Sequence, residues 1–189
     1  MSHLSRDFAV AICVFFLLVV TAAYFNIPTP ESENMKFGWE YGNIAEALVR
    51  GEGFANVFDA ESGPTAWMPP LFVFLLTGTF YLFGIKSIAA MWAIFIIKYT
   101  AMAACLYILL TVANHTGYQK YKYVLVPLFL IFILINRSAS FRTIHDDWFN
   151  LFLVCSMVSV FATRIYKPSK SNMNSTYILA FFLLLPTPF

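Results

Sequence analysis

Long apolar runs separated by short polar segments make up most of the chain. The first run, from Phe8 to Phe25, contains no charge, and its eighteen residues at about 1.5 Å each just cross a hydrocarbon core of about 30 Å. It ends in Tyr24-Phe25-Asn26-Ile27-Pro28 instead of a small-x-small cleavage site, which favours an uncleaved span over a signal peptide. Further apolar runs predict helices at 69–85, 88–113, 123–136 and 148–166, and a truncated span at 177–189.

The distribution of charge indicates which runs cross a membrane, because loop lysines and arginines favour the cytoplasmic side. The basic groups without an acidic neighbour in sequence are Arg6, Lys120 with Lys122, and those of 164–170. If 69–85 does not cross, all these groups lie inside, and nine of the ten acidic residues, all but Asp7, lie outside. The run 69–85 is also short and begins with two prolines. We therefore predict that it is an interfacial or re-entrant helix, and that the N-terminus is cytoplasmic.

Composition places the chain in the class of integral membrane proteins. Of the 189 residues, 60% are hydrophobic and only 12% are charged, whereas a soluble domain carries roughly 25% charged residues. This excludes a soluble enzyme, a disordered tail and a nucleic-acid-binding module, and a net charge of +2 indicates no polyanionic partner. We predict one all-α polytopic module with about five transmembrane helices. Cys13, Cys105 and Cys155 lie in apolar runs and are interpreted as small buried hydrophobes.

One charge falls inside a predicted span. Lys98 lies near the middle of 88–113, where a charge is costly and by default faces a protein interior or a wet cavity. The alternative is a tilted helix from which Lys98 snorkels to the outer surface.

The outer segment 26–68 begins with a linker rich in proline and acidic residues, and an amphipathic pattern follows it. The apolar stripe of this pattern is Tyr41, Ile44, Ala45, Leu48 and Val49. With Gly51 as a stop signal, it predicts a helix lying on the outer membrane face, with Glu40 at its N-terminal end. Free backbone N–H groups there favour a charged carboxylate, which is the state of a general base. From the residues alone, a cap of the helix is the favoured role of Glu40, and a general base is the alternative. We predict solvated charges at Glu46, Glu52, Asp59 and Glu61.

A second polar cluster, from Arg142 to Trp148, precedes the run 148–166 on the same predicted side as Glu40. Its adjacent acids Asp146 and Asp147 either cap that helix or orient a substrate hydroxyl. The sequence contains no hydrolytic triad, phosphate-binding glycine loop, dinucleotide fingerprint or zinc-ligand spacing.

Two strings then resemble a known family. Gly38–Phe54 is similar to the first outer loop of polytopic glycosyltransferases of the GT-C fold, and Gly63–Leu71, with the sequence Gly-Pro-Thr-Ala-Trp-Met-Pro-Pro-Leu, resembles the next landmark of that family. That family includes enzymes related to protein O-mannosyltransferases and bacterial aminoarabinose transferases. The short apolar helix ending at Phe83-Gly84 and the aspartate within Arg142–Leu151 match further landmarks, and the resemblance covers most of 1–170.

The resemblance implies transfer of a sugar from a polyprenyl-phosphate donor to a protein or glycolipid acceptor, on the outer side of a bacterial inner membrane. It makes Glu40 the base on the acceptor hydroxyl, with Asp147 and Asp146 as further catalytic candidates. The leaving phosphate needs cations or N–H donors nearby. The substrate-binding candidates are Lys98, Arg137, Arg142, Trp67 and Tyr41. No metal ligand is assigned, and dependence on a divalent metal stays open.

The chain departs from the family pattern in three ways. Phe37 and Gly38 stand where the family often has an acid, and Met68 stands where the aminoarabinose branch has a lysine. Family members are also several hundred residues long. The resemblance therefore implies the N-terminal portion of a larger enzyme, inactive in isolation. The alternatives are a non-catalytic membrane protein, either an assembly partner or a degenerate relative, and part of a transporter, for which no internal repeat is visible.

Overall fold

The computed structural model describes residues 3–25, 37, 39–59, 62–66, 68–115, 118–135, 144 and 146–166. Their regular structure is helical, apart from one isolated antiparallel bridge between Ala55 and Pro64. The helices are α1 (His3–Phe25), α3 (Trp39–Val49), α4 (Pro70–Phe83), α5 (Ile88–His115), the short 3₁₀ helix η2 (Lys122–Val124), α6 (Leu125–Ile135) and α8 (Asp147–Tyr166). The predicted run 177–189 lies outside the described residues.

Within the described residues, two helices are long and apolar enough to cross a membrane, Arg6–Tyr24 within α1 and Ile88–Asn114 within α5. The apolar helices Pro70–Phe83, Lys122–Ile135 and Asp147–Phe161 are shorter. Large apolar side chains are exposed on α1, for example Phe16 and Tyr24, and Tyr24 is 75% exposed. Such faces are rare on soluble proteins and are typical of surfaces that contact lipid or protein. The secondary structure of the described residues confirms the helical class, whereas the count of five membrane spans stays a prediction.

The chain divides into two compact units. The first contains the described residues within 1–20, 99–137 and 147–185, and the second those within 21–98 and 138–146. Helices α1 and α5 contribute to both units.

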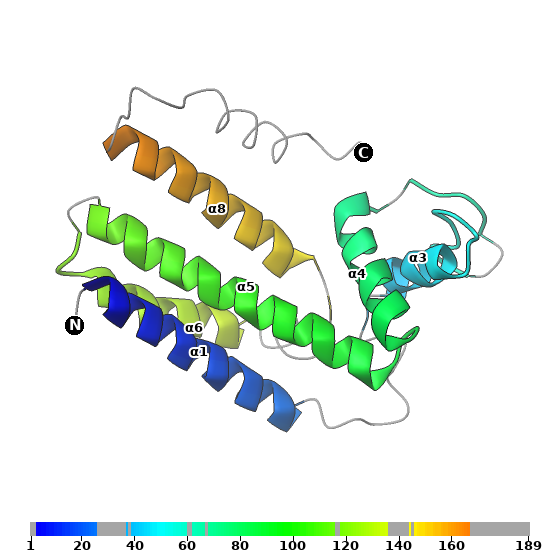
Figure 1. Ribbon diagram of the computed structural model, residues 1–189, viewed down its shortest axis with the longest axis horizontal. Helices are drawn as coiled ribbons and strands as arrows, with labels where there is room; N and C mark the ends of the chain where they lie inside the picture. The colour runs from blue at the N-terminus through cyan, green and yellow to red at the C-terminus, as the bar shows by residue number, and fades with distance from the viewer. Residues whose placement is uncertain are drawn as a thin grey trace. The chain divides into compact units, whose positions relative to one another are not determined.

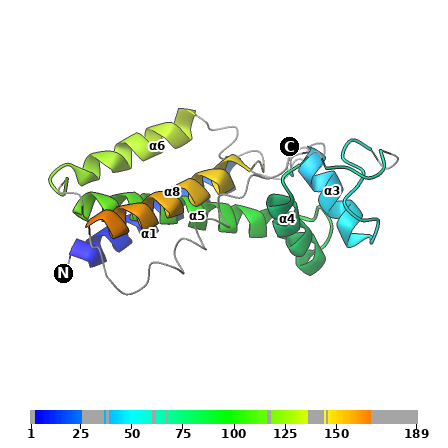
Figure 2. The ribbon, with the colours of Figure 1, turned by 90° about the horizontal axis from the view of Figure 1, so that it is seen from above.

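In the first unit α1 and α6 run in one direction, and α5 and α8 run in the opposite direction (Figures 1 and 2). The Phe8 ring of α1 meets the Tyr107 ring of α5 edge to face, with centroids 6.1 Å apart. Cys105 and Cys155 are buried as predicted, but the prediction for Cys13 is wrong, because its side chain is exposed. Cys13 lies on an outward face of α1 that its apolar sequence alone does not distinguish.

In the second unit α3 packs on α4 through paired aromatic rings. Tyr41 meets Phe72 with ring centroids 5.0 Å apart, and Phe37 meets Phe80 at 5.1 Å. The predicted stripe is thus real, but the inner part of it, including the fully buried Ile44, packs inside the unit. The apolar face of α4 covers this part of the stripe, and the aromatic pairs contribute to its burial. The location of α3 on the outer membrane face stays a prediction.

Candidate functional site

Glu40 lies in the first turn of α3 and its side chain is partly exposed. Among the residues that the structure describes, none donates a hydrogen bond to its carboxylate or forms an ion pair with it. Because the first-turn N–H groups of a helix lack intrahelical partners, a carboxylate at this end is favourably placed. Glu40 therefore lies at the start of a helix, as the sequence predicted. Among the described residues, none forms a hydrogen bond or an ion pair with its carboxylate oxygens.

The neighbouring carboxylates of the second unit are engaged with other side chains. Glu46 pairs with Arg50 one helical turn away and with Lys86 Nζ at 2.8 Å. The prediction of a merely solvated Glu46 is therefore wrong, because the turn between α4 and α5 brings Lys86 to it. Glu52 accepts a hydrogen bond from Asn56 Nδ2 at 2.7 Å.

Lys86 is a residue that sequence reasoning missed. Its ammonium also donates to Asn43 Oδ1 at 2.9 Å, so that it ties the α4–α5 turn to α3. Its φ of 49° is unusual for a residue with a side chain, and such conformations cost of order 1–3 kcal/mol. No local signal marks Lys86, since its partners lie 40 and 43 positions earlier in the chain.

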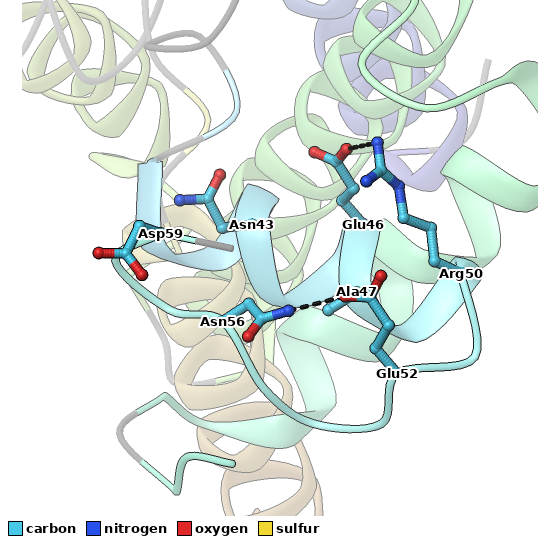
Figure 3. A pocket seen from close by; sticks show the side chains of 7 residues that line it. All are labelled: Asn43, Glu46, Ala47, Arg50, Glu52, Asn56 and Asp59. Carbon is cyan, nitrogen blue, oxygen red and sulfur yellow. Dashed lines mark hydrogen bonds and ion pairs between the residues drawn. The ribbon is translucent and has the colours of Figure 1, made fainter. Parts of the chain in front are cut away.

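A polar pocket of about 120 Å³ opens between α3 and the loop that follows it (Figure 3). Its lining is Asn43, Glu46, Ala47, Arg50, Glu52, Asn56 and Asp59. The loop returns through hydrogen bonds between Asn56 and Gly63, in which the Asn56 N–H donates to the Gly63 carbonyl at 2.9 Å. Asp59 accepts a hydrogen bond from Ser62 at 2.8 Å, which shapes the tip of the loop. The sequence did not predict that the loop residues of this lining, Glu52, Asn56 and Asp59, meet the helix residues.

Lys98 is 1% exposed within α5, and its ammonium lies 5.7 Å from the centroid of the Phe95 ring. The structure thus favours the first of the two sequence alternatives, an interior position, over snorkelling. A cation over an aromatic face is stabilised by the ring quadrupole, and this offsets part of the cost of burial. Tyr41, a predicted substrate contact, is 9% exposed, and its ring packs on Phe72.

The remaining predicted residues divide between the units. Asp147 is exposed in the first turn of α8, in the first unit, whereas Asp146 is partly exposed and belongs to the second unit with Glu40 and Lys98. Trp67, Arg137 and Arg142 lie outside the described residues. Within the described ranges, no group of three or more His, Cys, Asp or Glu side chains is arranged to hold a metal ion.

A buried polar cluster in the first unit was also missed. Lys122 Nζ lies 2.6 and 2.9 Å from the two oxygens of Asp7, and Asn114 Nδ2 donates to Asp7 Oδ2 at 2.6 Å. Tyr123 completes the cluster, with its hydroxyl 3.3 Å from Asp7 Oδ1. The sequence showed Lys122 as a basic group without an acidic neighbour along the chain, and tertiary packing brings the distant Asp7 to it.

No protein-family model, no curated protein and no solved structure matches the chain.

Proposed function

We propose that the chain belongs to a membrane glycosyltransferase that transfers a sugar from a polyprenyl-phosphate donor to an acceptor hydroxyl. The observation that carries the proposal is the placement of Glu40. Glu40 lies in the string that resembles the GT-C first outer loop, in the N-terminal turn of α3. None of the described residues forms a hydrogen bond or an ion pair with its carboxylate. The carboxylates of Glu46 and Glu52 nearby are engaged.

In the proposed reaction Glu40 accepts the proton of the acceptor hydroxyl. The hydroxyl oxygen attacks the anomeric carbon of the donor, a new glycosidic bond forms, and the bond from that carbon to the phosphate oxygen breaks. Polyprenyl phosphate leaves with the bonding electrons, and cations stabilise its negative charge. Among the described residues, Lys98 is the candidate for that role, and Asp146, in the same unit as Glu40, is the candidate for orienting the acceptor.

The directions of α1 and α5 support the proposed topology. These two helices are antiparallel within the first unit, and the Asp7–Lys122 ion pair joins the start of α1 to η2, shortly after the end of α5. If both helices cross the membrane in opposite directions, α1 ends and α5 begins on the same side. The segment between them, which includes α4, then lies on that side, so α4 does not cross. With a cytoplasmic N-terminus in a bacterial inner membrane, Glu40 then faces outward.

The test is sugar transfer by membranes from cells that express the gene product, assayed with a radiolabelled polyprenyl-phosphate sugar. The Glu40→Gln variant keeps the size and hydrogen-bonding groups but removes the base, and we expect transfer to fall by about 10²–10⁴-fold. Glu33→Gln, in the linker, is the matched control and is expected to keep full transfer. Unchanged transfer by Glu40→Gln would overturn the assignment of the base.

A non-catalytic relative that kept the fold is the second candidate, and the glycines favour it. Gly51, Gly53 and Gly63 have φ values of 79°, 81° and 73°, which favour glycine over residues with a side chain. The backbone conformation therefore accounts for these glycines, which lie in the strings that resemble the family, whether or not the protein catalyses a reaction. This candidate predicts no transfer by the unmodified protein.

A further inference from the structure

An apolar groove runs between α1 and α5 within the first unit. Its volume is about 320 Å³, and its lining is Phe8, Ala11, Ile12, Phe15, Thr100, Ala103, Ala104 and Tyr107. These positions recur at three- and four-residue spacing on both helices, so the groove follows about two helical turns, or roughly 10 Å, of each helix. Phe8 and Ile12 are 57% and 39% exposed, and the groove therefore opens on the surface of the unit.

The dimensions of the groove suit one hydrocarbon chain. Spread over roughly 10 Å of helix, the volume gives a mean cross-section of about 30 Å². A helix with its side chains is about 10–12 Å in diameter, so a helix of another chain does not enter a groove of this width. If α1 and α5 cross the membrane, the groove lies along the hydrocarbon core of one leaflet, which is about 15 Å thick, and lipid is the solvent that meets it.

A loop rich in tyrosine lies at the end of the groove that Phe8 forms. Asp7, the residue before Phe8, pairs with Lys122, so the loop between α5 and η2 lies beside the start of α1 (Figure 1). Tyr118 and Tyr121 in this loop are 66% and 62% exposed. Tyrosine side chains concentrate where lipid headgroups meet the hydrocarbon core. The loop therefore has the composition of a segment at the membrane surface.

The loop carries a positive charge that no described carboxylate neutralises. Lys120 is exposed, its ammonium lies 5.7 Å from the centroid of the Tyr121 ring, and it forms no ion pair with a described residue. The Asp7–Lys122 pair beside it is neutral as a whole. Asp147, the other acidic residue described in this unit, begins α8 at the opposite end, because α8 runs antiparallel to α1 (Figure 1). One lysine at a membrane surface favours an anionic over a zwitterionic lipid about fivefold.

We infer that this part of the first unit binds one anionic glycerophospholipid, with an acyl chain in the α1–α5 groove and the phosphate beside Lys120. The tyrosine rings of the loop then lie at the depth of the headgroup. In the proposed topology the lipid belongs to the cytoplasmic leaflet. The inference goes beyond sugar transfer, since it concerns a lipid other than the donor and requires only that α1 and α5 are embedded in a bilayer.

The experiment uses the full chain in lipid nanodiscs that contain a trace of photoactivatable phosphatidylglycerol or phosphatidylcholine. Both lipids carry the same acyl chain with a diazirine, and peptide mass spectrometry after illumination locates the label. We expect labelling concentrated at 8–15 of α1 and 100–107 of α5, and about fivefold stronger with phosphatidylglycerol. High salt is expected to weaken this preference by screening. Equal labelling by the two lipids, or labelling spread evenly along α1, would overturn the inference.

Paired variants test the two parts of the site. Lys120→Gln is expected to remove the preference for phosphatidylglycerol, whereas Lys120→Arg keeps the charge and the preference; both changes are at an exposed side chain and do not depend on repacking. Ala104→Leu fills the groove from α5 and is expected to abolish labelling at 8–15. Ala89→Leu, at an exposed position of the same helix outside the lining, is the matched control and is expected to keep it. A preference that survives Lys120→Gln would contradict the role of the charge.

Two further measurements separate this lipid from other occupants. Inorganic phosphate at millimolar concentration is expected to leave the preference unchanged, and loss of the preference would show a site for a free anion instead. Ile12→Cys, at the exposed edge of the groove in a chain without its other cysteines, is expected to stay monomeric when liposomes are treated with a thiol oxidant. Rapid formation of a disulfide-linked dimer would show that a second copy of the chain covers the groove, and the inference would fail.

Discussion

Asp7 and Lys122, 115 positions apart in the chain, form an ion pair in which the ammonium lies 2.6 and 2.9 Å from the two carboxylate oxygens. Asp7 is 0% exposed and Lys122 is 3% exposed. Two desolvated charges are tolerated only when further hydrogen bonds satisfy them, and Asn114 does this by donating to Asp7 and accepting from Lys122. The pair thus joins the first turns of α1 to η2.

Removing one partner of this pair is expected to destabilise the protein strongly. Asp7→Ala leaves the Lys122 ammonium buried without its counter-charge, and we expect a loss of about 3–5 kcal/mol in the free energy of unfolding. Replacing both residues, Asp7→Leu with Lys122→Met, is expected to recover most of that loss. Denaturant unfolding in detergent micelles measures both, and Lys120→Met, at an exposed lysine, is the control. Equal stability of Asp7→Ala and the control would contradict this role.

Two glycines without neighbours are expected to respond in opposite directions to alanine. A Cβ at Gly51 or at Gly78 would meet no atom within 4 Å, so only the backbone differs. Gly51 has a φ of 79°, and Gly51→Ala is expected to cost about 1–2 kcal/mol. Gly78 lies inside α4, and Gly78→Ala is expected to stabilise by about 0.5–1 kcal/mol. Unfolding of the two variants under the same conditions checks the contrast, and a gain in stability for Gly51→Ala would contradict it.

Lys98 offers a test of function that is separable from folding. Lys98→Met replaces a buried ammonium with an apolar chain of similar length. With transfer normalised to the amount of folded protein, we expect it to fall at least tenfold if the ammonium stabilises the leaving phosphate. Lys98→Arg keeps the charge and is expected to retain more transfer than Lys98→Met. Full transfer by Lys98→Met would remove Lys98 from the site.

The topology is tested with single cysteines in a background from which Cys13, Cys105 and Cys155 have been removed. A cysteine at the exposed Ser62 is expected to react with a membrane-impermeant maleimide added to intact cells, and one at Ser169 only after lysis. Labelling at both positions in intact cells would show that α4 crosses, and labelling at Ser169 alone would show that the N-terminus lies outside.

Much of the local structure was predictable, because helix formation depends on patterns within a few turns. The apolar runs locate α1 and α5, and the stripe ending at Gly51 locates α3. Glu40 was predictable too, since its place at the start of a helix depends only on the residues that follow it. The burial of Lys98 remained one of two alternatives in the sequence. The sequence determines the position of Lys98 along the helix, but not which face of the helix other parts of the chain cover.

The tertiary structure decided which distant residues meet. Lys122 was counted as a loop cation, yet it pairs with Asp7, and Glu46 was assigned to solvent, yet it pairs with Lys86. The pocket lining likewise combines α3 with a loop that turns back through the positive φ of Asn56. These contacts arise when helices dock and a loop closes. They depend on the burial and geometry of the whole unit, which the periodicity of any one segment does not encode.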